Sequence, residues 1–190
     1  GIDFNMSGTG NLAANVFGNV STNGFAGIQV NGDAASSGNF VLTTEAGDTI
    51  LADFVGIWSH AFGAASTANL TVVNNATLGA ITGTLDEGIT VATSGLGNVA
   101  VTNNGAIGTS PARVGIGVRA YSNNAAGTGT IAVNGSGAIF STGLGLDVQQ
   151  SGTGAVTVNY TGPINSTGPS GVVVGATTGP ASVTLGAVTA

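Results

Sequence analysis

The sequence predicts an all-β protein, a right-handed parallel β-helix solenoid of about seven rungs, each built from three short strands. Two observations support this prediction. A glycine followed by an aliphatic residue returns roughly every 26 to 32 residues, and apolar and polar residues alternate after it. Repeats of this length are typical of solenoids, in which each repeat contacts only its neighbours. A β-sandwich is the main alternative, but its strands usually differ in sequence, whereas these repeat in register.

The first strand of each predicted rung begins at the Gly-aliphatic pair. Side chains alternate between the two faces of a strand, so the aliphatic residue and the residue two positions later should point into a shared core. In the third rung this later residue is Ser59, the one polar member of its set. The pairs are Gly1-Ile2, Gly27-Ile28, Gly56-Ile57, Gly88-Ile89, Gly115-Ile116, Gly145-Leu146 and Gly171-Val172.

Two further strands complete each rung. Stacking the rungs at about 4.8 Å would pair the backbone groups of each with the rung above or below. Gly, Asn and Ser between the strands suit tight corners. We expect the second strands to begin at Leu12, Phe40, Leu70, Val99, Ile131, Val156 and Val183, and the third to be marked by Val20, Ile50, Ile81, Ile107, Ile139 and Ile164.

Composition excludes several kinds of site. The chain has 190 residues, no Cys, no Lys and a formal net charge of −6. Without Cys there can be no disulfide, thiolate metal site or Cys nucleophile. With two arginines as its only basic residues, the chain lacks the clustered positive charge that nucleic acids require, so we expect no nucleic-acid partner. No apolar run approaches the ~18 residues of a membrane span, so we expect no direct membrane insertion of this segment.

The recurring Gly-Ile-x-Val, Gly-x-Val-x-Val and Gly-Ala-Ile segments, in a chain rich in Asn, Thr and Gly, resemble the passenger region of an autotransporter, a type V secreted protein of Gram-negative bacteria. The resemblance covers the whole chain and rests on composition and period. It implies display outside the cell at the outer membrane, and a role in adhesion or aggregation. It also implies that residues 1–190 are a single β-helix segment of a longer protein, with a C-terminal membrane barrel beyond Ala190.

A candidate ligand-contact patch contains Asp53, Trp58, His60, Asp86 and Glu87. The acidic residues lie just before predicted first strands, and stacking would bring their corners to about 5 Å. Paired carboxylates at this separation suit glycoside hydrolysis. The indole of Trp58 is expected to point outward, where a sugar could stack, with the imidazole beyond it.

A structural interpretation competes with this patch. Arg113 lies two residues before Gly115, as Asp86 lies two residues before Gly88. The expected register therefore predicts a cross-rung ion pair between Asp86 and Arg113, of the kind that contributes little at a surface.

We predict no catalytic residue, no metal site and no cofactor. A single His cannot form a zinc site without partners. Corner glycines such as Gly8 and Gly10 precede no predicted helix that could receive a phosphate.

Three functions remain open at this stage. The first is a non-enzymatic extracellular rod, stalk or adhesin segment that gives reach and polar contact area toward a host or neighbouring-cell surface, glycans included. The second is a carbohydrate-binding or polysaccharide-cleaving β-helix, a glycoside hydrolase or lyase. The third is a filament or surface-layer component that self-associates through open terminal rungs.

Overall fold

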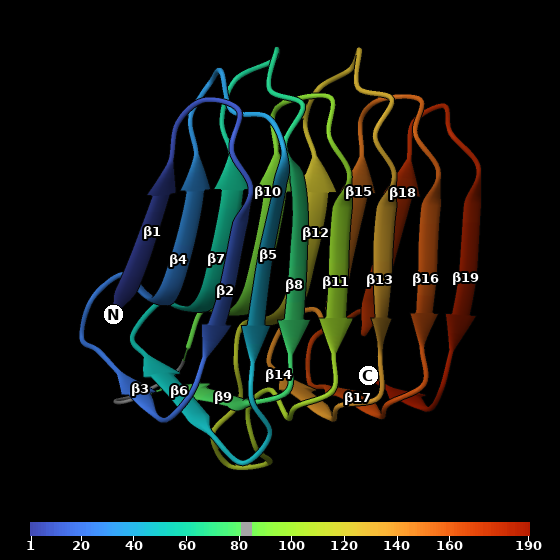
Figure 1. Ribbon diagram of the computed structural model, residues 1–190. Coiled ribbons are helices and arrows are strands. Elements are labelled where there is room, and N and C mark those ends of the chain that lie inside the picture. Colours follow the sequence, from blue (N-terminus) through green and yellow to red (C-terminus); the bar gives the residue numbers. More distant parts are fainter. Residues whose placement is uncertain (81–84) are drawn as a thin grey trace.

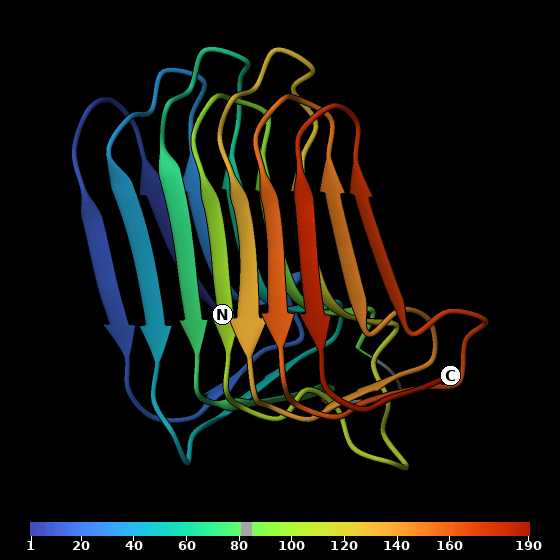
Figure 2. The same cartoon turned by 90° about the vertical axis from the view of Figure 1, so that its right-hand side faces the viewer.

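The chain winds as a right-handed parallel β-solenoid of about seven turns in the computed structural model, which describes residues 1–80 and 85–190. Each turn runs up one long sheet, crosses a corner, descends the facing long sheet and returns along the bottom (Figure 1). Figure 2 shows the strands of the two long sheets running in opposite directions. The described residues form strands, turns and bends but no helix, which confirms the predicted fold class.

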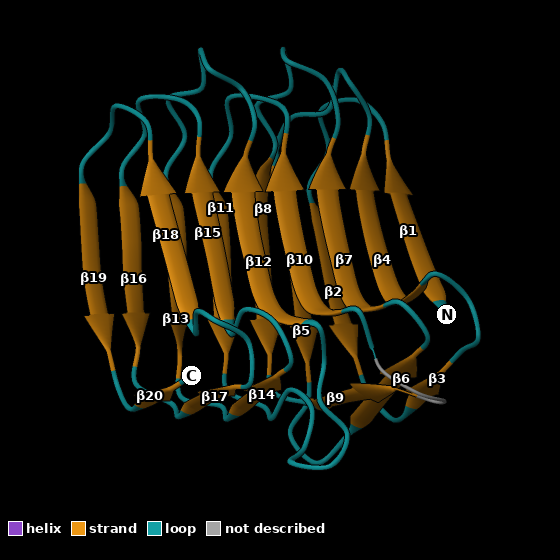
Figure 3. Cartoon of the chain, turned by 180° about the vertical axis from the view of Figure 1, so that it is seen from behind, coloured by secondary structure: helices purple, strands orange, loops and turns teal. Residues whose placement is uncertain are grey.

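Sheet A contains the first strand of each turn and faces the viewer in Figure 3. Every neighbouring pair in it is parallel. In order, its strands are β1 (Ile2–Met6), β4 (Ala26–Gly32), β7 (Val55–Ala61), β10 (Glu87–Thr93), β12 (Ile116–Ser122), β15 (Leu146–Gln150) and β18 (Val172–Ala176).

Sheet B faces it across the core, and two short sheets close the bottom of the solenoid. A bridge at Ile107 connects the two short sheets, through Leu78 on one side and Ile139 on the other. Sheet B contains β2 (Leu12–Val16), β5 (Asn39–Thr44), β8 (Asn69–Asn74), β11 (Val99–Asn103), β13 (Ile131–Gly135), β16 (Val156–Tyr160) and β19 (Ala181–Leu185); the short strands are β3 (Val20–Ser21), β6 (Thr49–Ala52), β9 (Thr77–Ala80), β14 (Ile139–Ser141), β17 (Ile164–Ser166) and β20 (Val188–Thr189).

The core is built from stacked columns of aliphatic side chains. Ile28, Ile57 and Ile89 lie directly over one another in register, and each is fully buried. The stacking predicted from the repeats is therefore confirmed at these positions. Because equivalent positions hold residues of similar size, the rungs keep nearly the same width.

The predicted register is wrong by two residues in the fifth turn. Val118 stands in the aliphatic column opposite Ile89, whereas Ile116 pairs with Glu87. The segment contains two Gly-aliphatic pairs, Gly115-Ile116 and Gly117-Val118. Because they are two residues apart, their aliphatic side chains lie on the same face of the strand, and the alternation alone does not distinguish them.

Two other strand positions also differ from the prediction. In the third-strand column, Leu78 pairs with Ile50 and bridges to Ile107, in the place expected for Ile81. Ile81 itself lies outside the described residues. In the last turn, Val183 pairs with Val158 and not with the first residue of β16, so β19 begins two residues earlier than expected.

The Gly-aliphatic signal has a steric cause. From the second turn onward, the glycine that enters the same column as Gly88 lies against an aliphatic side chain of a third strand. A Cβ on Gly88 would lie 2.4 Å from Ile107 Cγ2 and 2.6 Å from the carbonyl oxygen of Gly117 in the next turn. Gly117 and Gly145 meet the same obstacle from Ile139 and Ile164, at 2.4 and 2.2 Å. Any other residue would force the third strand and the next rung outward.

A column of polar side chains runs through the core at the end of sheet B. Thr44 donates a hydrogen bond to Asn74 (2.8 Å), whose amide donates to Asn103 (2.8 Å), and the Asn103 amide donates to the Tyr160 hydroxyl (2.7 Å). The phenol in turn donates to the carbonyl oxygen of Gly137 (2.7 Å). Asn103 is paired in register with Gly135, and Gly135 is paired with Tyr160. The hydrogen bond between Asn103 and Tyr160 therefore skips a turn.

We predict that Gly88→Ala destabilises the protein by about 2–3 kcal/mol, because the added methyl overpacks a junction with no free space. The matched control is Gly79→Ala, whose Cβ would meet Leu51 Cδ2 at an ordinary 3.4 Å. Urea unfolding midpoints measure the difference. Equal midpoints for the two variants would show that the glycine column does not set the packing.

A second prediction concerns alkaline stability. Burial raises the pKa of Tyr160 well above the ordinary value of about 10. The unfolded chain therefore loses this proton at lower pH than the folded chain, so the contribution is complete below about pH 10 and declines as the pH rises above it. We expect Tyr160→Phe to lower stability by about 1–3 kcal/mol at neutral pH, because the Asn103 amide and the Gly137 carbonyl lose a buried partner.

Urea midpoints of both proteins between about pH 8 and 11 test this prediction. The wild type should lose stability more steeply with pH than the Tyr160→Phe protein. An equal pH dependence of the two midpoints would contradict the assignment to Tyr160. The other tyrosine, Tyr121, is present in both proteins and therefore cannot cause a difference between them.

Candidate functional site

The outward side chains of sheet A form two rows that cross the turns of the solenoid. In-register pairing brings members of a row onto neighbouring strands, at one strand spacing from each other. The first row is Asp3, Gln29, Trp58, Thr90, Arg119, Asp147 and Val173, and the second is Asn5, Asn31, His60, Ala92, Tyr121, Gln149 and Gly175.

Five rings form an aromatic ridge over the second and third turns: Phe25, Phe54, Trp58, His60 and Phe62. The ring centroids of Phe25 and Trp58 are 5.4 Å apart, those of Trp58 and His60 are 5.7 Å apart, and those of His60 and Phe62 are 3.9 Å apart. Phe25 also stacks on Phe54 at 6.4 Å. The three phenylalanines are 43 to 52% exposed, so the ridge presents flat apolar surface to the solvent.

The predicted patch included two members of this ridge, Trp58 and His60, which indeed lie together. The three phenylalanines were missed, although the sequence contained a signal for two of them. Phe25 and Phe54 each lie two residues before the glycine of a first strand, so they occupy equivalent positions in successive rungs.

A charged cluster adjoins the ridge. The guanidinium of Arg119 forms ion pairs with Glu87 on one side and with Asp147 on the other, the latter at 3.1 Å. The Thr90 hydroxyl donates a further hydrogen bond to Glu87, and the Gln149 amide donates one to Asp147 at 3.0 Å. One cation on β12 thus links two carboxylates, one on each neighbouring strand, β10 and β15.

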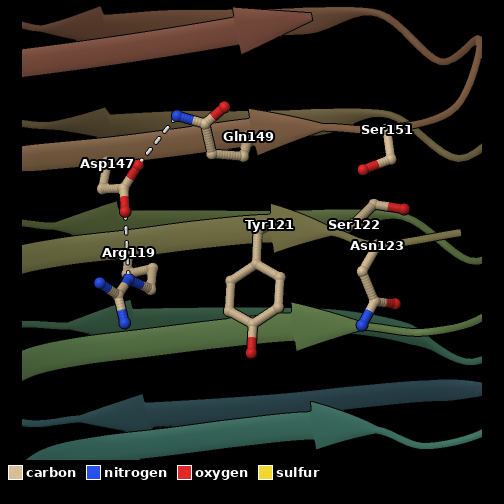
Figure 4. A pocket seen from close by; sticks show the side chains of 7 residues that line it. All are labelled: Arg119, Tyr121, Ser122, Asn123, Asp147, Gln149 and Ser151. Carbon is tan, nitrogen blue, oxygen red and sulfur yellow. Dashed lines mark hydrogen bonds and ion pairs between the residues drawn. The ribbon is translucent and has the colours of Figure 1, made fainter. Parts of the chain in front are cut away.

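A hollow of about 310 Å³ lies beside this cluster. Figure 4 shows Arg119, Tyr121, Asp147 and Gln149 around it. Burial raises the pKa of the Tyr121 phenol, and the nearby Glu87 carboxylate raises it further, against the opposing effect of Arg119. The phenol therefore keeps its proton at neutral pH and presents a hydrogen-bond donor beside the hollow.

The predicted acidic pair does not form as expected. Val55 pairs with Glu87, so the position opposite Asp86 belongs to Phe54 and not to Asp53. Asp86 is exposed at the corner, and Asp53 is half-buried at the preceding one. Of the three predicted acids, Glu87 alone joins the ion pairs of the charged cluster.

The expected ion pair between Asp86 and Arg113 is wrong because the register differs. Both ion pairs among the described residues involve Arg119. Arg113 instead donates to the carbonyl oxygens of Ser141 (3.2 Å) and Asn165 (2.7 Å) and to the Asn165 side-chain oxygen (3.0 Å). Its guanidinium also lies 5.8 Å from the centroid of the Phe140 ring. Both arginines are therefore bound within the structure.

The two carboxyl groups of the charged cluster are both paired with a cation. Glycoside hydrolysis needs two carboxyl groups facing a bond, one of them carrying a proton to donate. Glu87 and Asp147 share one guanidinium instead. Within residues 1–80 and 85–190, no group of three His, Asp or Glu side chains is placed to hold a metal ion. The described residues also form no helix that could cross a lipid bilayer.

Comparison with family models, with curated proteins and with solved structures finds no match for this chain. The functional interpretation therefore rests on the geometry of this face and on the sequence.

We predict that Arg119→Met lowers stability by about 1–2 kcal/mol, because two partly buried carboxylates lose their counter-charge. Adding Glu87→Gln and Asp147→Asn should restore much of this loss. Unfolding in urea, which does not screen charge, measures both effects. A triple variant as unstable as the single one would contradict an electrostatic role for the cluster.

Proposed function

We propose that this chain is a section of an extracellular rod of the autotransporter passenger type, displayed at the outer membrane of a Gram-negative bacterium. It acts without catalysis, as an adhesin or stalk segment that presents the outer face of sheet A to a partner surface. The observation that carries the proposal is the aromatic ridge, which exposes several rings on a regular, rigid scaffold.

The architecture supports this role. Each turn adds about 4.8 Å of length, so a solenoid converts chain length into reach. Each turn also packs mainly on its two neighbours, so a cysteine-free chain of this kind can order turn by turn. The exposed rings of Phe25, Phe54 and Phe62 lie next to the ends of β4 and β7 and pack on neighbouring rings, so they lose little conformational freedom when they bind.

The charge distribution supports contact rather than catalysis. The arginines are bound internally, and the polar surface is mainly Asn, Ser, Thr and Gly. A polysaccharide-cleaving enzyme is the alternative, favoured by the presence of Glu87 and Asp147 on the same face as Trp58. The shared guanidinium argues against it, since neither carboxyl group is free of a cation.

The proposal predicts surface display. When the complete gene that encodes this chain is expressed in a Gram-negative host, antibodies against residues 1–190 should label intact cells, and added protease should remove the signal. Cells should also gain adhesion to a surface or to one another. A matched control deletes the turns of this segment in frame and retains the rest of the gene, and adhesion should then fall.

Localisation of the chain to the cytoplasm would contradict the proposal. Release of reducing or unsaturated sugars from polysaccharides by the purified protein, abolished by Glu87→Gln, would favour the enzymatic alternative instead.

A further inference from the structure

The hollow of about 310 Å³ beside the charged cluster lies over two neighbouring strands of sheet A, β12 and β15. Its outward side chains face each other in pairs, one member on each strand, at one strand spacing. Along the strands, successive pairs are about 7 Å apart. The lining pairs are Arg119 with Asp147 and Tyr121 with Gln149, followed just past the strand ends by Asn123 and Ser151.

The hollow opens because Tyr121 and Gln149 point away from each other, as Figure 4 shows. The neighbour of Tyr121 on β10 is the small Ala92, and the neighbour of Gln149 on β18 is Gly175. A Cβ on Gly175 would lie 2.3 Å from Gln149 Oε1, so the amide occupies space that only a glycine leaves free. Small residues on the flanking strands therefore let the two side chains part.

The charged groups of the hollow are already engaged with each other. Arg119 pairs with Glu87 and, at 3.1 Å, with Asp147. The Gln149 amide donates to the other oxygen of Asp147 at 3.0 Å. Two carboxylates surround one guanidinium, so the cluster has a net negative charge and disfavours an anionic ligand. A cationic ligand would have to compete with Arg119 for a carboxylate that already accepts on both oxygens.

The groups that remain for a ligand are uncharged. The hydrogen bonds of the described residues leave free the Tyr121 hydroxyl, the Asn123 amide and the Ser151 hydroxyl. The Gln149 amide also keeps its oxygen and one N–H. Hydroxyl and amide groups both donate and accept, which matches the hydroxyl groups of a sugar. The ring of Tyr121 adds a flat apolar face for the C–H groups of a pyranose.

Peptides and nucleic acids fit this hollow less well. A peptide that extends a sheet binds unpaired main-chain groups at an edge strand, whereas β12 and β15 are paired on both sides. Nucleic acid requires clustered positive charge, and the one guanidinium here lies between two carboxylates. A sugar needs only polar side chains and a ring. The volume of the hollow is at the low end for small-molecule sites, which suits a few sugar units.

We propose that the hollow beside the charged cluster binds an uncharged saccharide, with sugar hydroxyls bonded to Gln149, Asn123 and Ser151 and a sugar ring packed against Tyr121. This inference rests on the proposed function and names the partner class of the contact face.

Calorimetry on the purified chain measures the binding. The probes are the neutral hexasaccharides of glucose in α- and β-linkage, of mannose, of xylose and of N-acetylglucosamine, with hexagalacturonate as the acidic comparison. We expect at least one neutral hexasaccharide to bind and hexagalacturonate to bind more weakly or not at all.

Tyr121→Ala and Gln149→Ala should each raise the Kd of the bound hexasaccharide by about tenfold, the change expected for one lost ring contact or hydrogen bond. Gly175→Ala should also raise it, because the added methyl displaces the Gln149 amide although Gly175 is not part of the lining. Gln29→Ala is the matched control. It makes the same change on an outward position of the same sheet, on β4, and should leave the Kd unchanged. Circular dichroism confirms that all four variants fold.

Three results would overturn the inference: no binding of any neutral hexasaccharide at millimolar concentration, equal Kd values for the wild type, Tyr121→Ala and Gln149→Ala, or binding of hexagalacturonate alone. Surface display of the chain is measured separately, by antibody labelling of intact cells. A chain that is displayed but binds no hexasaccharide would refute this inference and leave the proposed function standing. A chain that is not displayed would refute the proposed function, whatever the purified protein binds.

Discussion

The close approach between the first and third strands of each turn is the constraint on which the rest of the structure depends. A glycine such as Gly88 lies where a Cβ would overlap Ile107 and the backbone of the next turn. This contact fixes the width of the core and brings successive turns into register. The rows of outward side chains on sheet A exist because that register is maintained, so the ridge and the hollow beside the charged cluster follow from a contact on the inner side of the same strands.

The sequence was sufficient to predict the repeat, the three-strand turn and the direction of most core side chains. Alternation repeats every two residues, so it distinguishes the faces of a strand but not a shift of two positions. That ambiguity explains the fifth turn, where Gly115-Ile116 and Gly117-Val118 satisfy the same pattern. Which of the two pairs enters the glycine column depends on how many residues the preceding corner takes up. That corner contains the bridge between Val114 and Ser141. Such corner geometry has no periodic signal.

The candidate site was predicted less completely, for the same reason. Trp58 and His60 could be assigned to one outward face from alternation within a single strand. Arg119 and Asp147 lie on neighbouring turns, and their pairing becomes visible only with the correct register of the fifth turn. Placing Gly117 in the glycine column would have aligned these two side chains.

The hydrogen bond between Asn103 and Tyr160 skips one turn, because Gly135 leaves the space that the phenol fills. Repeat genes readily gain and lose whole units by recombination, and a solenoid of near-identical coils would tolerate such changes almost anywhere. Duplicating the coil that contains Gly135 would separate donor from acceptor, and removing it would take away the glycine that makes room for the phenol. A change in the number of coils along this stretch of the rod would therefore break the buried hydrogen bond that spans it.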